Sequence, residues 1–152
     1  MAIQFVPRFA VDDQQLSMLH ARAFGGNTAD VRPWSQRLEK HALTWIGAFD
    51  AERLVGFIQV GWDGGAHAFL LDTAVDPDRR HHGIGANLVN AAADGARAAG
   101  CEWLHVDFEP HLEHFYLGKC GFRATQAGLI QLKQVTTGPP RPGLKIDHMQ
   151  VP

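Results

Sequence analysis

The sequence has little cysteine, no long apolar run and no excess of charge of either sign. Its two cysteines, Cys101 and Cys120, are too few for a disulfide framework, and free thiols fit a reducing compartment. No stretch is apolar for long enough to cross a membrane, and the N-terminus lacks a signal-peptide pattern. The net charge of −2 provides no electrostatic footprint for nucleic acid or an anionic membrane. We therefore expect a cytoplasmic protein that binds neither nucleic acid nor membrane.

The length of the chain fits one domain. Its 152 residues are enough to bury a full core, and neither an internal repeat nor a low-complexity tract divides them. The composition changes only near the end, where TTGPPRPG over 136–143 is typical of an extended segment. We predict a single domain over 1–134 and a proline-rich C-terminal tail over 135–152 that could support a homodimer.

The most informative stretch is 76–86, with the sequence DPDRRHHGIGA. A short, strongly apolar segment, 68–75, precedes it and is closed by Asp-Pro, which predicts a strand buried on both faces. Apolar residues at helical spacing follow over 84–99, and Gly100 stands where a left-handed helix cap favours glycine. The stretch is therefore predicted to be a strand-to-helix turn with two glycines at its tightest point.

Such a turn can bind an anion. The first backbone N–H groups of a helix have no partner within the helix and lie at the positive end of its dipole. Gly83 and Gly85 would let an anion approach the backbone, and Arg79 and Arg80 add positive charge. Because hydrogen bonds to a charged group contribute roughly 1.5–3 kcal/mol each, several amides could hold a pyrophosphate. A plain turn with solvated arginines is the simpler alternative, but the coincidence of strand, arginines and helix start favours the anion site.

Two common phosphate-binding fingerprints do not fit this turn. A dinucleotide fingerprint needs a third glycine where Leu88 stands. A Walker-type loop needs Gly-Lys-Ser/Thr, but Gly85 is followed by Ala86 and Asn87. The pattern that fits is R-x-x-G-x-G/A, which starts at Arg80 and follows the strand end AVDP at 74–77. In this context it resembles the acyl-coenzyme A motif of the GNAT N-acetyltransferase superfamily.

The order of elements along the chain is similar to that of a whole GNAT domain. A strand near 3–9, two helices, a three-strand meander, the helix at 84–99, a strand, a helix and two strands are expected. The strands after the first are predicted at 43–49, 54–62, 68–75, 102–108, 122–125 and 129–132. The resemblance implies an α/β (α+β) fold with a mixed, mostly antiparallel twisted sheet of six to seven strands and about four helices. Its central parallel strands, here 68–75 and 102–108, would splay apart around the pantetheine arm.

The resemblance implies an N-acetyltransferase that uses acetyl-CoA as the acyl donor and no metal. Such an enzyme moves the acetyl group to a primary amine by direct attack in a ternary complex. The residues that match the coenzyme-binding motif are Ala74, Val75, Arg80, His81, His82, Gly83, Ile84, Gly85 and Ala86. The acceptor would be a small-molecule or peptide amine, covered by the helical region before residue 42. There Trp34 is either a core anchor or a substrate contact.

Three catalytic roles follow from that reaction. By resemblance, the backbone N–H of Val75 would stabilise the oxyanion of the tetrahedral intermediate. Because a lysine-like amine has a pKa near ~10.4, a base must take its proton, and Glu109 is the first candidate. Other candidates for the base are Asp72, His105 and Asp107. Tyr116 would protonate the departing thiolate, although one residue more separates it from Gly121 than in the frequent family pattern.

Two other functions stay open. The Phe-Tyr…Gly-Phe run also resembles metal-dependent vicinal-oxygen-chelate proteins of the glyoxalase kind, and His111 and His114 share one predicted helix face. Those proteins need paired βαβββ modules, in which the long alanine-rich helix and the glycine turn have no place. A non-catalytic domain that binds acyl-coenzyme A as a sensor would carry the same turn as an enzyme.

Overall fold

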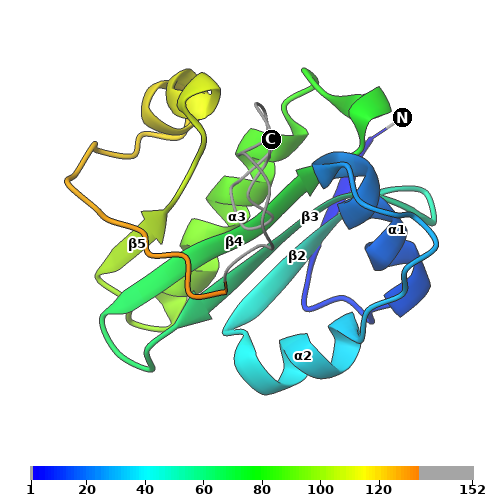
Figure 1. Cartoon of the computed structure of the whole chain (residues 1–152), viewed down its shortest axis with the longest axis horizontal. Coiled ribbons are helices and arrows are strands. Elements are labelled where there is room, and N and C mark those ends of the chain that lie inside the picture. The colour runs from blue at the N-terminus through cyan, green and yellow to red at the C-terminus, as the bar shows by residue number, and fades with distance from the viewer. Residues whose placement is uncertain (1, 134–152) are drawn as a thin grey trace.

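The computed structural model describes residues 2–133, and a five-stranded sheet forms its centre (Figure 1). The strands lie in the order β1-β2-β3-β4-β5, with bounds Gln4–Pro7, Thr44–Asp50, Arg53–Trp62, His67–Val75 and Trp103–Val106. Neighbours from β1 to β4 pair antiparallel, and β5 pairs parallel to β4. This arrangement confirms the predicted mixed α/β class, with one strand fewer than the lower predicted number in the described part of the chain.

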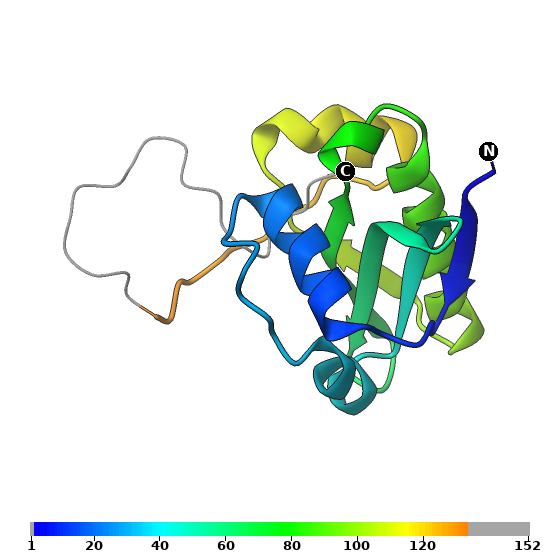
Figure 2. The ribbon, with the colours of Figure 1, turned by 90° about the vertical axis from the view of Figure 1, so that its right-hand side faces the viewer.

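Helices cover both faces of the sheet (Figure 2). Helices α1 (Asp13–Phe24) and α2 (Trp34–His41) lie on one face, and α3 (Ile84–Ala98) lies on the other. Each face has its own hydrophobic cluster. The α1/α2 cluster includes Leu16, Leu19, Trp34, Leu38, Trp45, Phe57 and Ala74. The α3 cluster includes Ile58, Leu70, Val75, Ile84, Leu88, Ala92 and Tyr116. The apolar stripes expected from helical spacing therefore form two separate cores.

A glycine lets α3 approach the sheet. A Cβ atom added to Gly56 of β3 would lie 3.0 Å from side-chain atoms of both Ile84 and Leu88 and 3.1 Å from Ala48. These distances are shorter than ordinary contacts in a packed interior, so a side chain here would push the helix outward. Gly56 therefore helps to fix where the first turn of α3 lies relative to the end of β4.

The parallel strands separate as predicted. The β4–β5 ladder runs only from the pair His67–Trp103 to the pair Leu70–Val106, so the last residues of β4 continue without β5 beside them. A β-bulge interrupts the pairing of β4 with β3 at the same level, and Asp72 in the bulge has φ 55°. Bulges bend a strand and redirect its side chains. The end of β4 is thereby turned away from the direction of β5.

The segment after β5 differs from the prediction. A 3-10 turn, Pro110–Leu112, and a π-helical turn, His114–Lys119, replace the expected helix. The strands predicted at 122–125 and 129–132 are not formed, and Ile130 and Leu132 are 82% and 91% exposed. Two strands of four residues are stable only where they pack on further structure, and these side chains have no such support in the described chain. The predicted tail, 135–152, lies outside the described residues.

Candidate functional site

Asp76 fixes the turn that links β4 to α3. Its buried carboxylate accepts hydrogen bonds from Arg22 at 3.1 Å, from Arg53 at 2.8 Å and from the Asp78 backbone N–H at 3.0 Å. Its own N–H donates to the carbonyl of Val55 at 2.8 Å. Bonds between ionised partners are shorter and stronger than neutral ones. One carboxylate therefore ties the turn to α1 and β3 at the same time.

The first turn of α3 is open to an anion. Gly83 is the N-cap residue, with φ 78°, and no side chain of the described chain accepts a hydrogen bond from the helix start. Only the Asn87 side-chain nitrogen, at 4.0 Å, would meet a Cβ atom built on Gly83. The backbone N–H groups that follow Gly83 are those that a helix cannot satisfy within itself. This geometry fits the predicted pyrophosphate site.

The two arginines of the turn have different surroundings. Arg79 forms an ion pair with the buried carboxylate of Asp50, so its charge is offset inside the protein. Arg80 donates to the carbonyl of Ala23 at the end of α1, at 3.3 Å, and its Nε is buried without a hydrogen-bond partner among the described residues. The prediction treated both arginines as available charge. Of the two side chains, Arg80 is the one with a buried donor that lacks a partner among the described residues.

Two histidines complete the turn. His81 has φ 67°, a left-handed conformation that only a few per cent of non-glycine residues adopt, and its side chain is exposed. His82 is also exposed, with its Nδ1 3.3 Å from the Arg79 carbonyl. Both side chains therefore lie on the outside of the turn, next to the open start of α3.

The backbone N–H of Val75 faces the space between the separating strands. Val75 pairs with Gly56 of β3. The next two residues, Asp76 and Val55, are joined by a hydrogen bond from the Asp76 N–H to the Val55 carbonyl. Because hydrogen-bonded and non-hydrogen-bonded pairs alternate in an antiparallel ladder, Val75 belongs to a non-hydrogen-bonded pair. Its N–H is directed away from β3, toward the side from which β5 has departed. The predicted oxyanion donor is thus in a suitable orientation.

Tyr116 lies in the α3 core next to the bulge of β4. Its side chain is fully buried, with its ring stacked on Phe108 at 5.1 Å between centroids. Burial raises the pKa of Tyr116 well above its ordinary value, and a contact with the Thr73 side chain offsets part of that shift. The hydroxyl, which is protonated at neutral pH even in an exposed tyrosine, therefore keeps its proton far into the alkaline range. This is the protonation state that a proton donor requires.

The π-helical turn accounts for the unusual spacing after Tyr116. The Cys120 N–H donates to the Phe115 carbonyl, five residues back, at 3.0 Å. A π-turn contains one residue more than an α-turn, so it absorbs the extra residue between Tyr116 and Gly121. The Phe122 N–H then closes back on the Tyr116 carbonyl at 3.0 Å. Tyr116 and the Gly-Phe pair are thus held together despite the longer spacing.

Glu109, the first candidate for the base, and the candidates His105 and Asp107 are partly or fully exposed. Glu109 keeps 20% of its side chain exposed and lies 3.4 Å from His111, without capping the turn that follows. His105 is exposed and lies 2.8 Å from His67, and Asp107 is also exposed. None of the described contacts joins these groups to Val75 or Tyr116.

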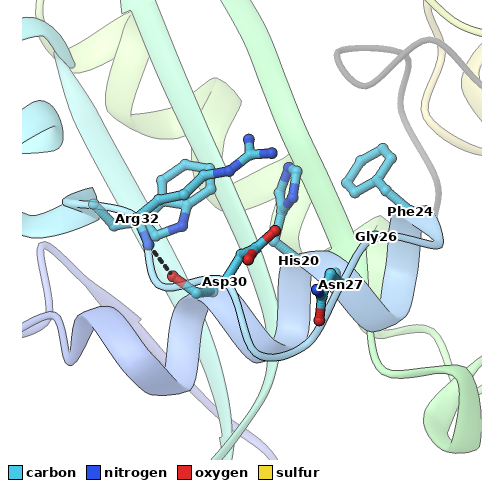
Figure 3. Close-up of a pocket in the computed structure, with 9 residues that line it drawn as sticks. His20, Phe24, Gly26, Asn27, Asp30 and Arg32 are labelled. Atoms are coloured by element: carbon cyan, nitrogen blue, oxygen red, sulfur yellow. Dashed lines mark hydrogen bonds between the residues drawn. The ribbon is translucent and has the colours of Figure 1, made fainter.

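Asp72 has a different environment, and it leads to a residue that the sequence analysis missed. His20 of α1 is buried, and its Nε2 lies 3.0 Å from the Asp72 carboxylate. His20 also lines a pocket with Ser17, Ala21, Phe24, Gly26, Asn27, Asp30, Arg32 and Trp34 (Figure 3). One feature of the sequence could have identified His20. It stands four residues after Leu16 and four before Phe24, on the apolar stripe of α1.

The comparison with protein families decides the relationship. The sequence profile of the Acetyltransferase (GNAT) family matches residues 13–122, which is most of the chain. This chain belongs to the GNAT acetyltransferase family. Family membership confirms the resemblance inferred from the Arg80–Gly85 turn, and it identifies the chain as an acyltransferase. It also removes the basis for the vicinal-oxygen-chelate alternative, whose paired modules do not match the single sheet described here.

Solved structures show the same fold at low sequence identity. An acetyltransferase from Trypanosoma brucei is 19% identical, with a TM-score of 0.69 over 86% of this chain and 99% of that one. Glucosamine-6-phosphate N-acetyltransferase from Arabidopsis thaliana is 15% identical, with a TM-score of 0.68 over 88% and 100%. Aminoglycoside N-acetyltransferase AAC(6')-Iy in complex with CoA is 16% identical, with a TM-score of 0.68 over 88% and 96%. No curated protein sequence gives a significant match.

In the described residues, no group of three or more histidine, cysteine, aspartate or glutamate side chains could hold a metal ion. His111 and His114 are both exposed on the turn after β5. None of the helices within 2–133 is both long and apolar enough to cross a bilayer.

Proposed function

We propose that this chain transfers an acetyl group from acetyl-CoA to a primary amine by direct attack in a ternary complex. The observation that carries the proposal is the orientation of the Val75 N–H, which is directed into the gap where β4 and β5 separate. Eight residues later, Gly83 begins the open first turn of α3. One continuous segment of strand, turn and helix can therefore bind both the thioester, near Val75, and the pyrophosphate, near Gly83.

The coenzyme site comprises the strand end and the turn. The proposed residues are Ala74, Val75, Arg80, His81, His82, Gly83, Ile84, Gly85 and Ala86. The backbone N–H groups after Gly83 bind the pyrophosphate, since they have no other partner and the helix dipole favours an anion there. The guanidinium group of Arg80 adds positive charge beside them. The solved relative AAC(6')-Iy, which has the same fold, was determined with CoA.

The catalytic groups act on the oxyanion and on the leaving sulfur. The Val75 N–H stabilises the oxyanion, because a preorganised donor strengthens its bond as charge develops. Tyr116, which is neutral at pH 7, gives its proton to the departing thiolate. Glu109 remains a prediction for the base that takes the amine proton. The acceptor is proposed to be a small-molecule or peptide amine.

A thiol-release assay tests the proposal. Purified protein is given acetyl-CoA and a panel of amino sugars, aminoglycosides, amino acids and peptides, and free CoA thiol is measured over time. We expect thiol release that depends on one amine class and on acetyl-CoA. Binding of acetyl-CoA without release for any amine would favour the non-catalytic sensor. Activity that requires an added divalent metal would contradict the proposal. The cytoplasmic location and the homodimer stay predictions.

A further inference from the structure

A buried polar network joins four elements on the α1/α2 face of the sheet. The Asp72 carboxylate, on β4, accepts from Gln59 of β3 at 2.5 Å and lies 3.4 Å from Arg37 of α2. Its other oxygen lies 3.0 Å from Nε2 of His20, on α1. The side chains of His20 and Asp72 are 8% and 10% exposed. Burying such groups is costly unless each is paired, and here each is.

The network fixes which nitrogen of His20 can exchange a proton. An ionised carboxylate only accepts hydrogen bonds, so Nε2 carries a hydrogen and donates it to Asp72. In the neutral ring, the lone pair is then on Nδ1. The carboxylate also stabilises the imidazolium that forms when Nδ1 takes a second proton. Asp72 thus holds His20 in the tautomer and orientation of a base.

The pocket beside His20 contains an unsatisfied donor. Trp34 lines the same pocket, with its ring 5.0 Å from that of His20. Trp34 is 1% exposed, and its Nε1 has no hydrogen-bond partner among residues 2–133. A buried N–H without a partner is rare in a native protein, and an indole nitrogen can only donate. An acceptor atom, such as an oxygen, on a bound ligand could supply the missing partner.

The pocket opens on the side of β4 opposite Tyr116. Asp72 and Thr73 are neighbours in the bulge, and they serve the two faces: Asp72 contacts His20, and Thr73 contacts Tyr116. His20 packs against Trp34 and Phe24 of the α1/α2 face, whereas Tyr116 belongs to the α3 core. A proton acceptor, His20, and a proton donor, Tyr116, thus lie on opposite faces of the strand that carries the Val75 N–H.

We propose that this pocket binds the acceptor amine and that His20, held by Asp72, is the base that takes its proton. The proposal rests on the acetyltransferase function proposed above. The substrate class is a small primary amine that carries an oxygen acceptor, such as a hydroxyl or carbonyl, for the Trp34 N–H. Apolar side chains and a few polar groups line the pocket together, as they do in sites for small molecules.

The proton balance is as follows. The ammonium group gives one proton to Nδ1 of His20, and the free nitrogen attacks the carbonyl carbon, so that a C–N bond forms. The C–S bond then breaks, and the sulfur takes the proton of Tyr116. The second proton leaves the nitrogen as the amide forms, and it restores Tyr116 through solvent. His20 releases its proton to water, so the cycle yields amide, free thiol and one proton.

The first test replaces His20 by glutamine. Asp72 contacts His20, Arg37 and Gln59 contact Asp72, and Asp30 and Arg32 line the same pocket; all five remain in this variant. We expect His20→Gln to lower kcat/KM at pH 7 at least a hundredfold and to leave acetyl-CoA binding unchanged. The loss should shrink as the pH rises toward the pKa of the amine, because more of the substrate is then already neutral. His41→Gln, at the exposed end of α2, is the matched control.

Three results would overturn this inference while leaving acetyl transfer intact. They are unchanged turnover in His20→Gln, a loss of equal size at every pH, and a larger, pH-dependent loss in Glu109→Gln. Absence of acetyl-CoA binding by the unaltered protein would instead contradict the proposed function. Circular dichroism of each variant checks that it is folded.

A second test does not depend on removal of the histidine. Trp34→Phe removes the indole N–H and keeps an aromatic ring in the pocket. For the best oxygen-bearing amine of the panel, for example glucosamine, we expect KM to rise at least tenfold with kcat nearly unchanged. For a hydrocarbon analogue, such as cyclohexylamine, KM should change less than twofold. Equal changes for the two amines would contradict the role of Trp34.

Discussion

Tyr116 is the only tyrosine of the chain, so its ionisation can be observed directly. Burial raises its pKa well above the ordinary value near ~10. Because the folded pKa exceeds the unfolded one, the contribution of this group to stability is present below about pH 10 and is lost as the pH rises further. We expect no tyrosinate absorbance in the folded protein at pH 10–11.

The absorbance should appear only when the chain unfolds, and the free energy of unfolding should fall above about pH 10. In Tyr116→Phe this part of the pH dependence should be absent. A tyrosinate signal with a midpoint near pH 10, in a protein that is still folded by circular dichroism, would show that the hydroxyl is accessible and ordinary. That outcome would contradict the increase in the pKa of Tyr116 on burial.

The same residue allows a kinetic prediction. Tyr116→Phe keeps the aromatic contacts with Phe108 and removes the proton donor, so we expect at least a tenfold loss of turnover with little change in acetyl-CoA affinity. Stopped-time thiol release with saturating acetyl-CoA measures the effect. Phe115→Leu, on the same π-turn, serves as the control for packing. Turnover within twofold of the unaltered protein would rule out the role of proton donor.

Single residues also show the limits of reading the sequence. The Arg80–Gly85 pattern could be identified because glycine and arginine have distinct local chemistry at a helix start. The pairing of Arg79 with Asp50 could not be predicted, since a contact between distant segments leaves no local pattern. His20 was missed for the same reason, because its partner Asp72 is 52 residues away.

At the level of elements, the turn between β4 and α3 depends on Asp76. Asp76→Asn leaves Arg22 and Arg53 facing a neutral group in a buried site. We expect a loss of about 2–4 kcal/mol in the free energy of unfolding, slightly less than the roughly 3–5 kcal/mol for a fully buried ion pair, because Arg22 and Arg53 are 34% and 50% exposed. Acetyl-CoA should also bind more weakly, because the turn is no longer fixed to α1 and β3. Denaturant unfolding and calorimetric titration measure the two effects.

Asp78→Asn is the matched control for that change. Asp78 also pairs with Arg22, at 3.1 Å, but its side chain is 72% exposed. Exposed ion pairs contribute about 0–1 kcal/mol, so the control should be nearly as stable as the unaltered protein. Similar losses in the two variants would mean that the burial of Asp76 does not matter.

The elements show where prediction from local pattern works. Helix α3 was predicted closely because its apolar spacing and Gly100, with φ 89°, specify it locally. The strands expected at 122–125 and 129–132 were wrong, since alternation alone does not provide a neighbour to pair with. The π-turn after Tyr116 could not be read from the sequence either, although the extra residue before Gly121 was visible.

For the whole molecule, the arrangement of two cores on opposite faces of one sheet matters most. The bulge at Asp72 lies where β4 separates from β5. At this level, neighbouring residues of β4 contact the cores on both faces of the sheet. The family and the fold were predictable, because the turn and the order of elements are properties of the sequence. The pocket proposed for the acceptor was not, since it is formed by α1, α2 and the segment between them only after folding.

The most direct test of the central claim is thermal unfolding with and without acetyl-CoA, with NAD and zinc as control ligands. A ligand at a hundred times its dissociation constant stabilises the folded state by ~2.7 kcal/mol, which raises the Tm of a domain of this size by roughly 5–10 °C. We predict such an increase with acetyl-CoA and none with NAD or zinc. No increase with acetyl-CoA, or an increase with zinc alone, would contradict the account.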